Sequence, residues 1–178
     1  MFRRRLKQLA DQSLMRRLSP LESGTGPTIH HAGREVILLS SNDYLGLATH
    51  PEVIRAAIHA TEQYGAGSGA SRLVSGTLPP HTHLETSLAT FKGTEAALLF
   101  GAGYLANIGV IPNLIGQGGL ILADRLCHAS LIDGCRLSRA DLRVFRHRDC
   151  AHLESLLRRR SASRPTLIIT EGLFSMDG

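Results

Sequence analysis

Apolar positions follow two different spacings along the chain. Between residues 51 and 64 they recur every three or four positions behind Pro51, which predicts a helix that ends at Gly65. The same spacing predicts other helices, and short apolar runs between turn residues predict strands. Helices are expected over residues 1–18, 82–92, 104–114, 129–137 and 151–159, and strands over residues 35–39, 96–100, 120–123, 142–145 and 166–170.

From residue 96 onward the predicted strands and helices alternate, which is typical of a parallel sheet with right-handed crossovers. The run Leu167–Ile169 is apolar at every position, as expected of a strand covered on both faces. We therefore predict an α/β fold with a mainly parallel sheet and helices on both faces. A small N-terminal arm of helix and strand is placed at residues 1–45, and the domain that contains the sheet at residues 46–178.

The composition narrows the class of protein. With 43% hydrophobic and 20% charged residues the chain is expected to be globular, and 4% aromatic residues with no Trp argue against a stacking surface for single-stranded nucleic acid. The uncharged stretch 96–123 is long enough to cross a bilayer, but Pro112 and six glycines interrupt it, so no membrane helix is expected. Three cysteines without a C-x-x-C pair favour free thiols in a reducing cytoplasm.

The net charge of +5 is concentrated in two basic clusters. One lies in the first 18 residues, which hold a single acid, and the other is Arg158–Arg160. Such clusters are typical of solvated helix faces, and they also attract anionic ligands such as phosphate or coenzyme A. No nucleic-acid-binding motif accompanies them.

Three candidate loops follow predicted strands. Phe100–Tyr104 is glycine-rich and opens a helix, so its backbone N–H groups could seat a phosphate, although many such turns are glycine-rich for packing alone. His128 follows the next strand, and residues 170–177 follow the last one. Ligands in open α/β sheets bind beyond the carboxyl ends of strands, so the three loops together suggest a site but not its reaction.

Five motifs give the chain a resemblance to a known family. They are Ser41–Leu47, Gly67–Gly76, His83–Glu85, Asp124–Leu131 and Thr170–Gly178. In this order they resemble the α-oxoamine synthases, over nearly the whole chain. The resemblance implies an incomplete fold-type-I transferase that depends on pyridoxal 5'-phosphate, works as a homodimer, and joins an amino acid to an acyl thioester with loss of carbon dioxide.

The form of the Gly67–Gly76 motif is most similar to the member that uses L-alanine and a pimeloyl thioester, carried by coenzyme A or by a carrier protein, in biotin synthesis. A sibling such as a glycine C-acetyltransferase is the alternative. No nucleic acid or membrane partner is expected.

The same resemblance implies roles for individual residues. Gly103 and Tyr104 match the turn on the phosphate side of the cofactor. His128 matches the histidine that stacks on the pyridine ring and borders the substrate. Ser175 matches a residue near the ring oxygen, and Glu171 lies in the same motif. On the substrate side, Asn42 matches a position near the amino acid's carboxylate, and Arg16 matches an arginine that would hold the far carboxylate of the pimeloyl chain.

The family's later motifs supply the Schiff-base lysine and the aspartate that pairs with the pyridine nitrogen, and neither motif is present here. The chain has only two lysines, Lys7 and Lys92, and neither lies in such a motif. We therefore expect no catalytic residue within these 178 residues and no activity from the chain alone. Two interpretations stay open: an incompletely recorded synthase, or a non-catalytic remnant that binds a ligand or a partner.

Overall fold

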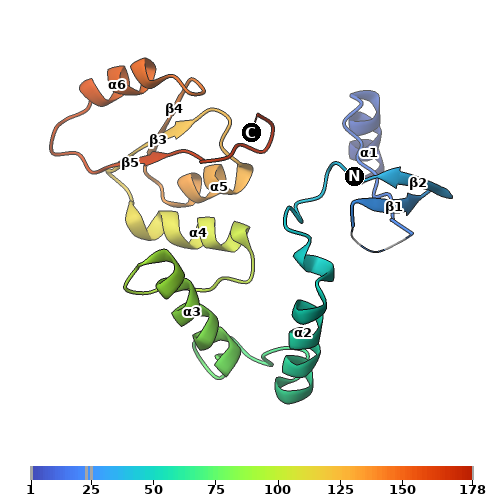
Figure 1. Ribbon diagram of the computed structural model, residues 1–178. Helices are drawn as coiled ribbons and strands as arrows, with labels where there is room; N and C mark the ends of the chain where they lie inside the picture. Colours follow the sequence, from blue (N-terminus) through green and yellow to red (C-terminus); the bar gives the residue numbers. More distant parts are fainter. Residues whose placement is uncertain (1, 23, 25, 178) are drawn as a thin grey trace. The chain divides into compact units, whose positions relative to one another are not determined.

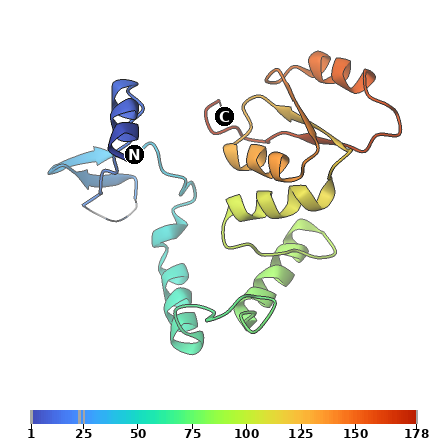
Figure 2. The same ribbon diagram turned by 180° about the vertical axis from the view of Figure 1, so that it is seen from behind.

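The computed structural model describes residues 2–22, 24 and 26–177, which form two compact units that meet in sequence at His83 and Leu84. The ribbon is drawn in Figure 1 and, from behind, in Figure 2. The expected division of the chain at residue 45 stays a prediction. Among the described residues, no helix is long and apolar enough to cross a membrane.

The first unit contains helices and one hairpin. Its helices are α1 (Phe2–Asp11), the short 3-10 helix η1 (Leu47–Thr49) and α2 (Pro51–Tyr64), and α3 (Pro79–Lys92) begins in it and continues into the second unit. The prediction of a helix over residues 1–18 was wrong at its end, because Ser13 adopts a left-handed φ of 55° and the N–H of Leu14 turns back to the carbonyl of Leu9 at 2.8 Å. This arrangement closes the helix as a Schellman motif does.

The hairpin pairs β1 (Thr28–His31) with β2 (Arg34–Ile37) in antiparallel register. The two residues of its turn, Ala32 and Gly33, have φ values of 51° and 69°, as two-residue hairpin turns require. The sequence predicted a strand over 35–39 but no partner for it, so β1 was missed.

The second unit is built on a parallel sheet of three strands in the order β4-β3-β5. The strands are β3 (Leu120–Asp124), β4 (Asp141–Phe145) and β5 (Thr166–Ile169), and the helices α4 (Gly103–Leu114), α5 (Ala129–Leu137) and α6 (Cys150–Arg158) alternate with them. The prediction of a parallel α/β arrangement is confirmed.

The buried strand β3 supplies side chains to two separate apolar clusters. Ile121 and Ala123 pack with Ile111 of α4 and Cys135 of α5 on one face. On the other face Leu120 and Leu122 pack with Phe145 and the leucines of α6. Side chains alternate along a strand, so β3 is apolar at nearly every position because helices cover both of its faces. Figure 1 and Figure 2 show α4 and α5 on one side of the sheet and α6 on the other.

The predicted strand over residues 96–100 was wrong, since this segment forms no strand. A strand needs a hydrogen-bonding neighbour, and the sheet β4-β3-β5 does not pair with it. The backbone N–H of Leu99 instead donates to a side chain, Glu85 Oε1, at 2.7 Å.

Arg164 links the amino ends of the three strands by hydrogen bonds. Its guanidinium donates to the carbonyls of Gly118 and Gly119 at 3.0 and 2.9 Å and to Asp141 Oδ2 at 3.2 Å. One side chain therefore ties the segments that lead into β3, β4 and β5 at the edge opposite the candidate loops.

Candidate functional site

The loops that follow β3, β4 and β5 lie at the same edge of the parallel sheet, because parallel strands all end there. The loop after β3 carries His128, and the loop after β5 carries Glu171 and Ser175. The two loops are joined directly, since the backbone N–H of His128 donates to Glu171 Oε2 at 2.6 Å. Two of the predicted site residues are thus brought together although 43 positions separate them.

The helix α4 begins at Gly103 without a capping side chain. Its N-cap residue is Ala102, whereas His50, His128 and Asp149 cap α2, α5 and α6 through their side chains. A Cβ built on Gly103 would meet no atom within 4 Å, so the space beside the first turn is open. The first N–H groups of a helix have no carbonyl partner within it, and the helix dipole makes this end attractive to an anion.

Tyr104, the second residue of α4, is anchored to α5. Its hydroxyl donates to Asp133 Oδ2 at 3.2 Å. The negative charge of Asp133 raises the pKa of Tyr104, helped by desolvation and by the hydrogen bond itself. The phenol therefore stays protonated and keeps donating, which links the first turn of α4 to α5.

His128 is the N-cap residue of α5. Its Nδ1 lies 3.2 Å from the backbone nitrogen of Ser130 and 2.7 Å from the Ser130 hydroxyl. Asn107 of α4 in turn donates from Nδ2 to the same hydroxyl at 2.9 Å. The imidazole of His128 therefore belongs to a chain of hydrogen bonds that joins α4 and α5, and the backbone N–H of the same residue reaches the loop after β5 through Glu171.

A second histidine, His147, lies beside this loop. Its Nδ1 is 2.9 Å from Oδ1 of the buried Asp124, and its Nε2 is 3.3 Å from Asp177 Oδ2. The ring of Phe174 meets His147 edge-on at a centroid distance of 4.6 Å. Phe174 and Asp177, on the two sides of Ser175, thus both lie against one imidazole. Asp124, Phe174 and Asp177 lie in two of the family motifs, but His147 lies outside all five, so the sequence did not indicate that these residues meet.

Asp124 closes β3 and accepts three hydrogen bonds. Burial alone would raise the pKa of its carboxyl, but donation from the Leu126 N–H, His147 and the Arg148 N–H at 2.8, 2.9 and 3.1 Å lowers it below its usual value. Asp124 is therefore a carboxylate that fixes the loops after β3 and β4.

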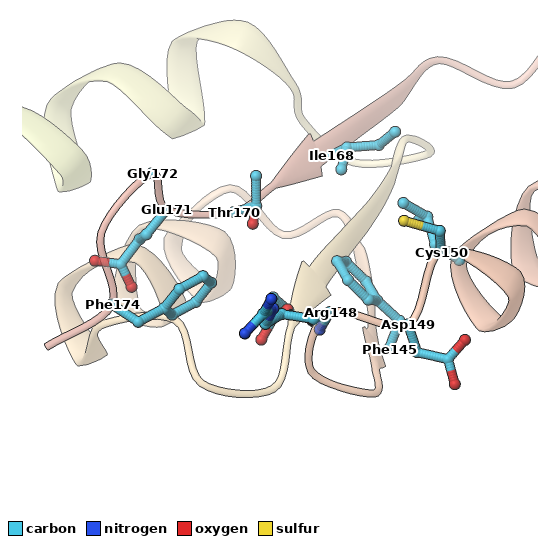
Figure 3. Close-up of a pocket in the computed structure, with 11 residues that line it drawn as sticks. Phe145, Arg148, Asp149, Cys150, Ile168, Thr170, Glu171, Gly172 and Phe174 are labelled. Atoms are coloured by element: carbon cyan, nitrogen blue, oxygen red, sulfur yellow. Dashed lines mark hydrogen bonds between the residues drawn. The ribbon is translucent and has the colours of Figure 1, made fainter. Parts of the chain in front are cut away.

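A cavity of about 470 Å³ opens on the α6 side of this edge. Its lining combines charged and apolar side chains from the ends of all three strands, as Figure 3 shows with Glu171 and Phe174 facing Phe145 and Cys150 across it. His128 is not part of this lining, so the cavity adjoins the loop of Glu171 from the side opposite α5.

The remaining predicted site residues lie in the first unit. Arg16 is exposed beyond the end of α1. Asn42 is also exposed, and its Oδ1 accepts from the hydroxyl of Tyr44 at 3.3 Å. The roles suggested for both stay predictions, as do the ligand contacts of Ser175, which is exposed in its loop. Within the described part of the chain, no group of three or more His, Cys, Asp or Glu side chains could hold a metal ion.

Comparison with known proteins identifies the family. The family model described as "Aminotransferase class I and II" matches residues 34–178. Curated relatives include 8-amino-7-oxononanoate synthases from Geobacter sulfurreducens, 54% identical over 97% of this chain, and from Geobacter metallireducens, 49% identical over 99%. The chain covers 44% and 45% of these proteins, so it spans less than half of their length.

Solved structures confirm the fold. Serine palmitoyltransferase from S. paucimobilis, with PLP bound, is 33% identical and superposes over 98% of this chain and 44% of its own with a TM-score of 0.88. The Sphingomonas wittichii enzyme is 35% identical over 98% of this chain and 44% of its own, with a TM-score of 0.87. An 8-amino-7-oxononanoate synthase from Francisella tularensis, 30% identical, matches 77% of this chain and 37% of its own with a TM-score of 0.64.

The predicted fold class, part of a fold-type-I α/β structure, is therefore confirmed. The chain belongs to the aminotransferase class I and II family.

Proposed function

We propose that the protein acts as an 8-amino-7-oxononanoate synthase, which condenses L-alanine with a pimeloyl thioester, releases carbon dioxide and serves biotin synthesis. The observation that carries this proposal is the identity of 49–54% with curated proteins of that name over 97–99% of the chain. The joining of the loops of His128 and Glu171 supports it, because a site assembled from these loops is what the resemblance implies.

A serine palmitoyltransferase activity is the second candidate, favoured by TM-scores of 0.87 and 0.88 with enzymes of that name. The fold is shared among members with different acyl donors, so superposition discriminates poorly between them. Sequence identity discriminates better: it reaches 49–54% with the two curated 8-amino-7-oxononanoate synthases from Geobacter, although it is 30% with the one from Francisella tularensis, and it is 33–35% with the serine palmitoyltransferases. The synthase of alanine and pimeloyl thioester is therefore preferred.

The site residues fit pyridoxal phosphate as a cofactor. The uncapped N-terminus of α4 and the open space beside Gly103 suit a phosphate group. When bound, pyridoxal phosphate supplies an electron sink for the α-carbon of the amino acid. In this proposal Gly103 and Tyr104 bind the phosphate through their backbone N–H groups, His128 packs its ring on the cofactor, and Ser175 contacts it near the ring oxygen.

Glu171 has a separate role in the proposal. Its carboxylate accepts from the His128 N–H at 2.6 Å and so fixes the spacing between the loops after β3 and β5. A hydrogen bond to a charged group is worth more than one between neutral groups, so this contact is suited to holding two cofactor-binding loops in register.

Arg16 and Asn42 are proposed to bind the substrates. The guanidinium of Arg16 would hold the distal carboxylate of the pimeloyl chain in a two-pronged contact, and Asn42 would lie near the carboxylate of alanine. Both side chains are exposed, which leaves them accessible to ligands.

The 178-residue chain by itself is proposed to be inactive. Its lysines are Lys7 in α1 and Lys92 in the last turn of α3. Neither lies in the loops that carry Gly103, His128 and Ser175. A polypeptide of residues 1–178 is therefore expected to bind pyridoxal phosphate without forming a covalent bond to it. Borohydride reduction followed by mass spectrometry would show a lysine adduct if this expectation is wrong.

The protein is proposed to form a homodimer in the cytoplasm. Support for a reducing location comes from three free cysteines, of which Cys127 and Cys135 are buried. Burial raises the pKa of the Cys127 thiol to about 11, so it stays protonated and unreactive.

The decisive experiment uses the full-length protein. Incubation with L-alanine and pimeloyl-CoA should yield 8-amino-7-oxononanoate by mass spectrometry, at a higher kcat/KM than the product of L-serine and palmitoyl-CoA. The reverse order of kcat/KM would favour the second candidate.

The phosphate site is tested by Gly103→Asp, which places a negative charge beside the first turn of α4. We expect the Kd for pyridoxal phosphate to rise at least about tenfold, roughly 1.4 kcal/mol, because the anion is repelled. The control is Ser163→Asp, which adds the same charge on an exposed loop before β5. An unchanged Kd in Gly103→Asp would contradict the proposed site.

A further inference from the structure

The proposed function assigns no role to two polar residues of the candidate site, Asn107 of α4 and the buried Ser130 of α5. Ser130 is 2% exposed, and its hydroxyl lies between Asn107 Nδ2 at 2.9 Å and His128 Nδ1 at 2.7 Å. These three side chains come from the first two turns of α4, the first turn of α5 and the loop before it. They form one continuous line of hydrogen bonds.

The direction of the hydrogen bonds in this line follows from its fixed donors. The backbone N–H of Ser130 can only donate, so Nδ1 of His128, 3.2 Å away, is an acceptor and carries no proton. The amide Nδ2 of Asn107 is also a donor, so the Ser130 hydroxyl accepts from it and turns its own hydrogen toward Nδ1. A neutral His128 ring then carries its proton on Nε2.

A close approach of two helices makes the line possible. A Cβ at Gly134 would lie 2.8 Å from the backbone oxygen of Asn107 and 2.9 Å from Cδ1 of Ile111. Gly134 is one helical turn beyond Ser130, so the absence of a side chain there lets α4 approach α5 where Asn107 must reach the hydroxyl. Figure 1 and Figure 2 show the two helices side by side.

We infer that Asn107 and Ser130 are positioning residues that hold the His128 ring in one orientation and in the tautomer protonated on Nε2. The hydroxyl of Ser130 restrains rotation of the imidazole, and Asn107 fixes the direction of that hydroxyl. The orientation and tautomer of the ring are properties of the chain itself. Only the packing of the His128 ring on a cofactor rests on the proposed function.

The first test is spectroscopic and does not depend on activity. The full-length protein is labelled with ¹⁵N-histidine, and the signals of His128 are assigned by their loss in His128→Gln. The shifts should show a protonated Nε2 and an unprotonated Nδ1. A proton on Nδ1 would overturn the inference.

The second test compares matched variants on the same helices. Ser130→Ala leaves the longer backbone contact at 3.2 Å as the donor to Nδ1, so it should allow a mixture of tautomers, and Ser130→Thr, which keeps the hydroxyl, should restore the single one. Ser138→Ala removes the other buried serine hydroxyl of this region, which donates to the Cys135 carbonyl at 2.6 Å, and should leave His128 unchanged. Equal effects of Ser130→Ala and Ser138→Ala would overturn the inference.

Asn107→Asp reverses the hydrogen bonding without removing bulk. A carboxylate only accepts, so the Ser130 hydroxyl should turn toward position 107 and leave Nδ1. The tautomer signals of His128 should change, whereas Asn113→Asp, on the same helix with its Nδ2 bound to the Gly109 carbonyl at 2.7 Å, should not change them. Unchanged signals in Asn107→Asp would remove Asn107 from the proposal.

Cofactor binding separates this inference from the proposed function. The Kd for pyridoxal phosphate should rise about 3- to 10-fold in Ser130→Ala, the size expected for one lost hydrogen bond, and stay unchanged in Ser138→Ala. If the unaltered protein binds no pyridoxal phosphate, the proposed function fails, and the ¹⁵N signals still decide the tautomer.

Discussion

At the scale of single residues, the candidate site depends on polar groups whose partners come from distant parts of the chain. The sequence indicated His128, Glu171 and Ser175 because they lie in motifs next to strand ends. It gave no indication of His147, since histidine is common in loops and its partners Asp124 and Asp177 lie 23 positions before it and 30 after it. Motifs identify residues, but their hydrogen-bond partners become visible only in three dimensions.

Because of Asp124, the free energy of unfolding should decrease at low pH. The pKa of its carboxyl is lower in the folded state than in the unfolded chain. Its contribution to the free energy of unfolding is therefore fully present above the pKa of the unfolded state, about 4, and is lost as the pH falls through the pKa of the folded state. Asp124→Asn should lower the free energy of unfolding by roughly 1–3 kcal/mol at neutral pH, because a carboxylate that accepts three hydrogen bonds is replaced.

Denaturant unfolding between about pH 3 and pH 7 checks this prediction. The Asp124→Asn variant should lose less stability on acidification than the unaltered protein. Asp11→Asn, a change of an exposed carboxyl at the end of α1, serves as the control and should follow the unaltered protein. Identical pH profiles for both variants would contradict the role of Asp124.

At the scale of helices and strands, most of the second unit could be predicted from apolar spacing. The helix over 129–137 was predicted at its observed bounds, and the strands at 120, 142 and 166 within one residue of their observed starts. The failures have physical reasons. Residues 96–100 have the composition of a strand but belong to neither sheet of the described chain. The strand β1 was missed because the Ala32-Gly33 turn lacks the usual Asn-Gly or Asp-Gly signal.

The crossing of α4 and α5 should be sensitive to a single methyl group. Gly134→Ala places a Cβ 2.8 Å from the backbone oxygen of Asn107, so the helices must move apart. Alanine stabilises a helix relative to glycine by about 1 kcal/mol, whereas overpacking costs about 1–3 kcal/mol. We therefore expect the free energy of unfolding to fall.

Thermal unfolding and the ¹⁵N signals of His128 together measure the effect of Gly134→Ala. The variant should lower the Tm and disturb the hydrogen bond between Asn107 and Ser130. Gly116→Ala is the control, because a Cβ there would be 4.0 Å from the Ser138 carbonyl, an ordinary contact. A Gly134→Ala protein with a raised Tm and unchanged histidine signals would show that the crossing tolerates a side chain.

At the scale of the whole molecule, the sheet of the second unit has two strand edges. In the described part of the chain β4 and β5 each pair only with β3. Ile168 on β5 is 44% exposed, and Val144 on β4 is 48% exposed. Unpaired strand edges with apolar side chains are templates for pairing with another chain.

A polypeptide of residues 1–178 made alone is therefore expected to associate. Sedimentation velocity should show a mean mass that rises with protein concentration. Ile168→Lys should weaken the association, since charged side chains protect strand edges. Leu18→Lys, a change at a fully exposed leucine outside any helix or strand, should not weaken it. A monomer with a cooperative melt at every concentration would contradict this prediction.

The hydrogen bonds of Arg164 lie at the end of the sheet opposite the candidate site. β3 is five residues long, so about 15 Å separates the amino ends that Arg164 ties from the loops of His128 and Glu171. A substitution of Arg164 should therefore lower the stability of this unit from the end of the sheet that lies away from these loops. Substitutions of Asp124 or of the buried Ser130, at the loop end, should affect both stability and ligand binding, so the amino end is where this unit can vary without altering the candidate site.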